Sequence, residues 1–240
     1  MAERYRLGAY NVRKGRNPER VLREIVRLMR RQRLDALNVS EFNTQLDHVR
    51  ANLPDHLELV CYPNGDIAAR DSAIVIDTRR AARKGRRAFQ RRLHGMGGKG
   101  WERAPHNRGA GLHNPRKAVS VRLGVLRIGA DHWPPGPHGR GYPLRAAAHG
   151  KMQRRITRIS RRWSDQARPN AGAWVWFGDK NMRPDDPRAV RLQQETEGTA
   201  HGTGIDWLLA GPDVMVLRVR KVRAKWLRSD HPAVVAVVEV

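Results

Sequence analysis

The 240-residue sequence lacks several features that would place it in familiar classes of protein. It has a single cysteine, Cys61, which excludes an internal disulfide and favours a reducing compartment. Its wholly apolar runs, such as 233–238, are far shorter than the ~18 residues that a membrane span needs. The opening residues, MAERYRLGAYNV, carry charges where a signal peptide has an apolar segment. We therefore expect an intracellular protein without an export signal.

Acidic residues are also scarce compared with basic ones. Lys and Arg total 47 against 23 Asp and Glu, a formal net charge of +24. Such a charge repels itself unless a polyanion is a regular partner. Nucleic acid is the first candidate, DNA before RNA, and an anionic membrane surface or an acidic protein are the alternatives. Because Arg outnumbers Lys by 39 to 8, a GC-rich genome also fits part of the arginine content.

Apolar residues recur in patterns that predict alternating strands and helices. Residues 5–12 alternate as in a strand. Asn17, Pro18 and Glu19 form a helix start, and apolar residues follow at helical spacing as far as Met29. Further strands are predicted at 34–41, 57–62, 72–77, 118–123, 125–130, 173–181, 205–210, 214–222 and 233–238, with helices at 44–53, 152–163 and 187–194. This order predicts an α/β or α+β fold of two packed sheets with helices outside.

One stretch, residues 79–117, breaks this pattern. It has 13 Lys or Arg and one acid, Glu102, together with the Gly-rich segment HGMGGKG and no sustained periodicity. A stretch of this length without secondary structure is unusual inside a domain, so it is either functional or mobile. Two interpretations remain open. The stretch grips the phosphates of a polyanionic partner, or it is an Arg-rich loop against which nothing selects.

Polar residues gather at the ends of the predicted strands. Taken singly, each has an ordinary explanation as a cap, a turn residue or a surface acid. Taken together they are harder to explain in this way, because carboxylates, amides and imidazoles recur at the edges of successive buried strands. The residues are Asn11, Glu41, His132, Asp179, Asn181, Asp206, Asp230 and His231.

The same residues occur in motifs that resemble the endonuclease/exonuclease/phosphatase superfamily, which has the deoxyribonuclease I-like fold. The motifs are YNVR, LNVSE, GADHW, GDKN, GIDWLL and SDHPAV, in the right order and rough spacing. The resemblance runs from about residue 5 to the C-terminus. It implies a single domain over 1–240, a four-layer sandwich of two central sheets flanked by helices, with a basic insertion at about 79–117.

The resemblance also implies a role for each residue. Glu41, Asn11 and Asp230 would hold Mg²⁺ or Mn²⁺, since this ion needs only a few carboxylate or amide oxygens from the protein. Asp179 would orient or deprotonate the attacking water, and Asn181 would donate to a phosphate oxygen. His231 would contact the phosphate while Asp206 holds its ring. His132 would be the second imidazole, and Asp71 is either its acidic partner or a turn acid.

The chain departs from the family pattern at position 180 and over residues 131–133. Lys180 stands between Asp179 and Asn181, where the family has an apolar or aromatic residue. The segment Asp131-His132-Trp133 stands where many members have Thr-His-Leu. We expect Lys180, Arg13, Arg103 and Arg108 to contact substrate.

The expected function is a metal-dependent endonuclease that acts on DNA with low sequence specificity, since no base-reading motif is present. A phosphatase or phosphodiesterase of small phosphoesters or lipid head groups is an alternative. A nucleic-acid-binding protein with a decayed site is another. The basic residues 23–31 are either a phosphate-binding surface or a solvated helix face.

Overall fold

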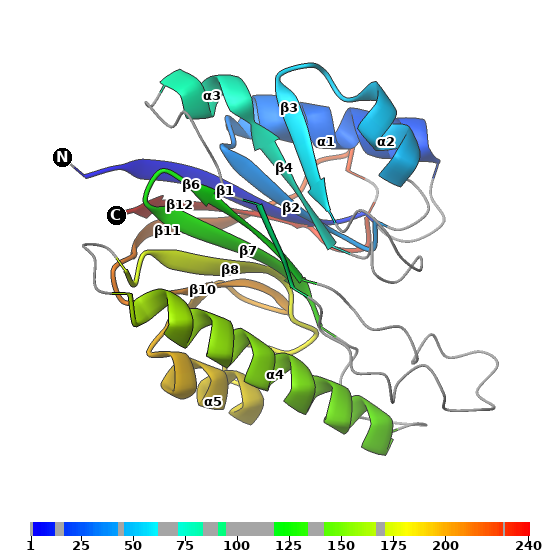
Figure 1. Cartoon of the computed structure of the whole chain (residues 1–240). Helices are drawn as coiled ribbons and strands as arrows, with labels where there is room; N and C mark the ends of the chain where they lie inside the picture. Colours follow the sequence, from blue (N-terminus) through cyan, green and yellow to red (C-terminus); the bar gives the residue numbers. More distant parts are fainter. Residues whose placement is uncertain are drawn as a thin grey trace.

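The computed structural model describes residues 2–12, 17–42, 46–61, 72–83, 91–94, 118–133, 142–166, 171–227 and 229–240, with the backbone alone for 91–94 and 142–148. Its strands form two six-stranded sheets that pack face to face, and helices cover both outer faces (Figure 1). This is the four-layer arrangement that the sequence predicts. The two ends of the chain lie close together, because the first and last strands are neighbours in one sheet.

The first sheet has the order β11-β12-β1-β2-β4-β3. β1 runs parallel to β2 and antiparallel to β12, so the ends of β1 and β2 reach the same edge of the sheet. The helices α1 and α2 lie over its outer face (Figure 1). The elements are β1 (Arg4–Asn11), α1 (Pro18–Gln32), β2 (Ala36–Ser40), α2 (Leu46–Asn52), β3 (Leu57–Cys61), β4 (Ser72–Asp77), α3 (Thr78–Arg83), β11 (Met215–Val222) and β12 (Ala233–Glu239).

The second sheet has the order β5-β6-β7-β8-β10-β9. β7 and β8 are its parallel pair, and β10 runs antiparallel to β8. The helices α4 and α5 cover its outer face (Figure 1). The elements are β5 (Arg91–His94), β6 (Ala118–Leu123), β7 (Leu126–His132), α4 (Tyr142–Ser164), β8 (Trp174–Asp179), α5 (Pro187–Thr196), β9 (Thr199–His201) and β10 (Asp206–Ala210).

The core has three layers, and the alternation of side chains along each strand builds them. In β8, Val175 and Phe177 join the apolar cluster between the sheets. Trp174 and Trp176 point the other way and pack with the apolar side of α4. Strand β1 divides its side chains in the same manner. Strands buried on both faces explain why the sequence shows nearly continuous apolar runs at these positions.

The helix starts are those that the sequence predicts. The side chain of Asn17 accepts a hydrogen bond from the backbone of Arg20, and Pro18 occupies the first turn. Asp186 caps α5 in the same way, with Pro187 in its first turn. Each cap satisfies a backbone N–H that has no partner within the helix. None of the helices among the described residues is long and apolar enough to cross a membrane.

The described ends of the basic stretch correct the expectation of a segment without secondary structure. Residues 78–83 form the helix α3, and residues 91–94 form β5, which pairs antiparallel with β6. The sequence RRLH does not indicate a strand, because this strand forms through its backbone pairing with β6. The three-residue strand β9 was not predicted either, and it too exists through pairing, in this case with β10. The remainder of the basic stretch lies outside the described residues.

Candidate active site

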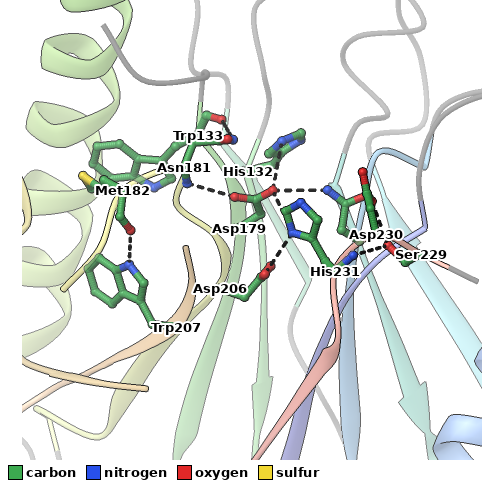
Figure 2. Close-up of polar contacts among 11 residues, drawn as sticks. His132, Trp133, Asp179, Asn181, Met182, Asp206, Trp207, Ser229, Asp230 and His231 are labelled. Atoms are coloured by element: carbon green, nitrogen blue, oxygen red, sulfur yellow. Dashed lines mark hydrogen bonds and ion pairs between the residues drawn. The ribbon is translucent and has the colours of Figure 1, made fainter. Parts of the chain in front are cut away.

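Polar side chains gather where the strands of both sheets end, on the faces that the two sheets turn toward each other (Figure 2). Asn11, His132 and Asp179 are the last residues of β1, β7 and β8. Each continues the series of residues that faces the core between the sheets, two positions after Ala9, Ala130 and Phe177 respectively. The site is therefore the polar end of the apolar layer between the sheets.

Asp179 is the centre of this cluster. It is only 2% exposed. Its Oδ1 accepts the backbone N–H of Asn181 at 2.8 Å, and its Oδ2 accepts the Nδ2 of Asn11 at 3.2 Å. The Asn11 contact crosses from one sheet to the other. Two imidazoles also face Oδ2, with His132 Nε2 and His231 Nδ1 each 3.8 Å from it.

Burial is the main influence on the charge of Asp179. It raises the pKa of this carboxyl above its ordinary value, since a carboxylate loses its hydration inside the protein. The neighbouring Asp206 raises this pKa further, while His132, the N–H of Asn181 and His231 lower it. A carboxylate with a raised pKa accepts a proton more readily than an exposed one, which suits a general base.

Asp206 and His231 form a hydrogen-bonded pair. Asp206 begins β10 directly opposite Asp179 in the antiparallel ladder, so both carboxyl groups face the same side of the sheet. His231 lies just before β12, in the other sheet. Its Nδ1 lies 3.0 Å from Oδ2 of Asp206. The structure therefore places these two residues together as the resemblance implies.

This pairing changes the protonation of His231. The hydrogen bond with Asp206 raises the pKa of His231 to about 9, against the opposing effect of burial, and the charges of Asp206, Asp179 and Asp230 add to the rise. The ring is therefore a cation at neutral pH. Because Nδ1 is engaged by Asp206, the Nε2–H is the donor that a substrate would meet.

Local turns hold the remaining side chains. Asn181 has a positive φ of 49°, a conformation that asparagine tolerates, and its Nδ2 donates to the carbonyl of Trp133 at 2.7 Å. Ser229 Oγ accepts the backbone N–H of His231 at 3.1 Å and lies 3.3 Å from Oδ1 of the exposed Asp230. These contacts fix the turn that presents His231 (Figure 2).

Glu41 lies at the same edge of the first sheet. It follows the last residue of β2, Ser40, which is paired with Asn11 in the parallel ladder. Its φ of 59° turns the chain out of the strand at this point. Among the described residues, one group of three His, Cys, Asp or Glu has ligand atoms within 4.8 Å of one another, namely Asp179, Asp206 and His231. This group differs from the metal ligands expected from the sequence, Asn11, Glu41 and Asp230.

The hydrogen bonding of His231 decides how this group is best interpreted. Nδ1 of His231 already contacts Oδ2 of Asp206, so this nitrogen is engaged within the group. The group of three is thus a network of a histidine and two acids. Glu41 and Asn11 offer a carboxylate and an amide at the ends of adjacent parallel strands, a set of hard oxygen donors that fits Mg²⁺ or Mn²⁺.

Lys180 corrects an expectation from the sequence. It is fully buried and forms an ion pair with Asp131, so its side chain is not available to a substrate. Burial lowers the pKa of Lys180, and Asp131 acts in the opposite direction. The alternation of the strand explains the location, because Lys180 follows Asp179 and its side chain points to the opposite face. Asp131 was not among the site residues predicted from the sequence, although its position next to His132 at the end of a strand could have indicated it.

Four other candidates lie outside the described residues: Arg13, Asp71, Arg103 and Arg108. Their assigned roles stay predictions. Among the residues that the structure describes, Asp179 lies near His132, opposite it in the parallel ladder of β7 and β8. Asp179 is buried, and its position at the end of a predicted strand did not indicate this.

Comparison with solved structures relates this arrangement to known proteins. The chain is similar to an endonuclease/exonuclease/phosphatase from Bacteroides vulgatus, with 14% identity and a TM-score of 0.68 over 99% of both chains. An AP endonuclease from Leishmania major matches with 14% identity and a TM-score of 0.65, over 99% of this chain and 88% of that one. A mannosyl-6-phosphatase from Bacteroides thetaiotaomicron matches with 13% identity and a TM-score of 0.64, over 98% and 99%. No family model and no curated protein matches the sequence.

These likenesses establish the fold. The chain has the endonuclease/exonuclease/phosphatase fold, also called deoxyribonuclease I-like, over almost its whole length. At 13–14% identity they do not choose among the activities that this fold supports.

Proposed function

We propose that this protein is a divalent-metal-dependent hydrolase of phosphodiesters, and that it acts as an endonuclease of low sequence specificity on DNA. The observation that carries the proposal is the meeting of Asp179, Asp206 and His231 within 4.8 Å at the ends of strands from both sheets. Phosphodiester hydrolysis needs an acceptor for the proton of water and a cation beside the phosphate, and this network supplies both.

Asp179 is the proton acceptor. Its carboxylate is held at both oxygens, by the Nδ2 of Asn11 and the N–H of Asn181, so it cannot rotate away from an attacking water. Burial raises its pKa, which makes it a better base than an exposed carboxylate. His132 Nε2 lies 3.8 Å from Oδ2 of the same carboxylate, and its effect on the pKa of Asp179 opposes that of Asp206.

His231 and Asn181 bind the phosphate. His231 carries its positive charge at neutral pH, since Asp206 raises its pKa to about 9, and its Nε2–H donates to a phosphate oxygen. Asn181 is held at the same strand end by its contact with the Trp133 carbonyl, and the second proton on its Nδ2 is available to another phosphate oxygen. Donors that are held in place before reaction stabilise the negative charge that builds on the phosphate.

Glu41 and Asn11 would hold the divalent ion, with Asp230 close in sequence to His231 as a further oxygen donor. Bound there, Mg²⁺ or Mn²⁺ would neutralise charge on the phosphate and on the leaving oxygen. The similar structures include an AP endonuclease and a mannosyl-6-phosphatase, which supports phosphoester chemistry in general, and the identity of the ion is a question for experiment.

Charge supports DNA as the substrate. The chain carries a formal +24, and the outer face of α4 exposes a run of arginines on the described part of the surface. These arginines are Arg154, Arg158, Arg161 and Arg162. Contacts to phosphates provide affinity without sequence preference, which is why we propose low specificity. Among the similar proteins, one is an AP endonuclease and another a mannosyl-6-phosphatase, so the substrate needs a direct test.

The test compares two substrates. Purified protein is incubated with supercoiled plasmid and Mg²⁺ or Mn²⁺, with and without EDTA, and in parallel with a soluble phosphate monoester. We expect nicked plasmid that EDTA prevents, little release of phosphate from the ester, and no nicking by Asp179→Asn. Rapid release of phosphate without plasmid cleavage would overturn the nuclease and indicate a phosphatase. DNA binding without hydrolysis of either substrate would overturn the enzyme altogether.

A further inference from the structure

A second polar cluster lies directly behind the candidate active site, on the opposite face of the same sheet. His132, Asp179 and Asp206 point into the space between the sheets. Their neighbours along the strands, Asp131, Lys180 and Trp207, point toward the layer of α4 and α5. Trp207 packs in the apolar cluster of that layer. The residues of this rear cluster are Asp131, Trp133, Lys180 and Trp207, and all four are fully buried.

Asp131 is the centre of the rear cluster. One of its oxygens accepts from the ammonium of Lys180, and the other accepts the indole N–H of Trp133 at 2.7 Å. The ammonium of Lys180 also lies 5.4 Å from the centre of the Trp207 ring, within the range of a cation–π contact. A buried ion pair is worth having only if its geometry is good and its other hydrogen bonds are made, and here both oxygens of Asp131 are used.

The rear cluster connects the three strands that carry the active-site residues. Trp133 donates its backbone N–H to the carbonyl of Asp179 at 2.9 Å, and its own carbonyl receives the side chain of Asn181. Lys180 donates its backbone N–H to the carbonyl of Ile205, the residue before Asp206, at 2.8 Å. Trp207 donates its indole N–H to the carbonyl of Met182 at 2.8 Å, as Figure 2 shows.

The strands approach each other closely at this point. A β-carbon on Gly178 would lie 2.0 Å from the carbonyl oxygen of Asp131, so only glycine fits there. The ends of β7 and β8 are therefore in direct contact just before His132 and Asp179. A small displacement of Asp131 would be passed on to both.

We propose that Asp131 and Lys180 are positioning residues that hold His132, Asp179, Asn181 and Asp206 in their working arrangement from behind the sheet. Asp131 orients Trp133, and Trp133 in turn orients Asn181. The side chain of Lys180 joins Asp131 at the end of β7 to Trp207 in β10. The structure shows that the two residues are partners in one buried ion pair. The inference rests on the proposed hydrolase function.

The test separates positioning from simple stability. Removing one partner leaves a buried charge unpaired and can unfold the protein, so the informative variants remove both charges. In Asp131→Leu/Lys180→Met the apolar pair keeps the fold, but Trp133 loses its acceptor. We expect a thermal midpoint near that of the wild type, a kcat lower by about tenfold or more, and little change in KM, because misplaced groups slow chemistry more than binding.

A conservative variant tests the route through Trp133. In Asp131→Asn/Lys180→Met the amide oxygen can still accept the indole N–H, so we expect much of the lost kcat to return. A structural readout is independent of activity. The Nε1–H signal of Trp133, assigned with Trp133→Phe, should move in the Leu/Met variant and stay near its wild-type position in the Asn/Met variant. Arg218→Met removes an exposed charge on β11 and serves as the control.

The outcomes are distinct. A folded Leu/Met variant with wild-type kcat would overturn the positioning role. Equal loss of kcat in both double variants would overturn the route through Trp133. If the wild type hydrolyses neither plasmid nor a small phosphodiester, the proposed function fails instead, and the indole signals still report whether Asp131 holds Trp133.

Discussion

The imidazole of His231 and the carboxylate of Asp206 meet at 3.0 Å although they belong to different sheets. Asp206 begins β10 of the second sheet, and His231 precedes β12 of the first. Their hydrogen bond therefore depends on the packing of one sheet against the other. It also sets the charge of the imidazole, which the proposed mechanism needs as a cation.

The protonation of His231 predicts how stability varies with pH. Its pKa is about 9 in the folded protein and about 6.5 ordinarily. The pair with Asp206 thus contributes stability fully below the ordinary value, and this contribution is lost as the pH rises through about 9. We expect the difference in thermal midpoint between wild type and Asp206→Asn to shrink over that interval. The exposed Asp165→Asn is the control. A difference that does not change with pH would contradict the shift.

Asp179→Asn should lower the activity of the protein and raise its thermal stability. Burial raises the pKa of Asp179, so its charge costs folding free energy at neutral pH, and the penalty disappears as the pH falls toward the ordinary value of 3.8. The asparagine carries no charge. We expect a higher thermal midpoint than wild type at neutral pH, with turnover lower by ~10² or more because the base is lost. The idea fails if the variant is less stable than wild type at neutral pH.

Glu41→Gln should raise the metal concentration that activity requires. The substitution keeps the size and one oxygen of the side chain but removes the charge from the proposed ligand set. We expect activity to require a higher concentration of Mg²⁺ or Mn²⁺, with the loss largely recovered when the metal is saturating. Titration of plasmid nicking against metal concentration measures this. An unchanged titration would remove Glu41 from the metal site, and Glu58→Gln on β3 is the matched control.

His231→Ala should lower turnover by ~10² or more, because it removes a cation that contacts the phosphate in the transition state. The loss should appear in kcat more than in KM. The wild-type rate should also fall above pH 9, where His231 loses its proton. Plasmid nicking across this range measures both effects. Near wild-type turnover in the variant would exclude His231 from catalysis.

Arg103 and Arg108 provide a test of the basic stretch. If each neutralises one phosphate, replacing both by Gln should flatten the slope of log affinity against log salt by about 1.8, at about 0.9 per phosphate on duplex DNA. Hydrolysis of a small phosphodiester should barely change. Binding measured over a range of salt gives the slope, and Arg4→Gln/Arg218→Gln, two exposed arginines of the first sheet, removes the same charge elsewhere. Equal slopes in the two variants would exclude a phosphate-binding role for Arg103 and Arg108.

Much of the fold could be predicted because its signals are local. The Asn17-Pro18 cap, the apolar stripe of α4 and the short apolar runs each specify one element through neighbours in the chain. The strands β5 and β9 could not be predicted in this way. They are short and lack alternation, and they owe their order to the backbone partners of β6 and β10.

The sequence by itself determined which residues stand at strand ends, and an ordered series of motifs was enough to indicate the fold and to nominate the site. Only the tertiary structure decided which face each of them occupies and what it meets. Asp179 and Lys180 are adjacent in sequence, yet one faces the candidate active site and the other is buried behind it with Asp131. The reason is that side chains alternate along a strand, and their partners come from strands and sheets that are distant in the chain.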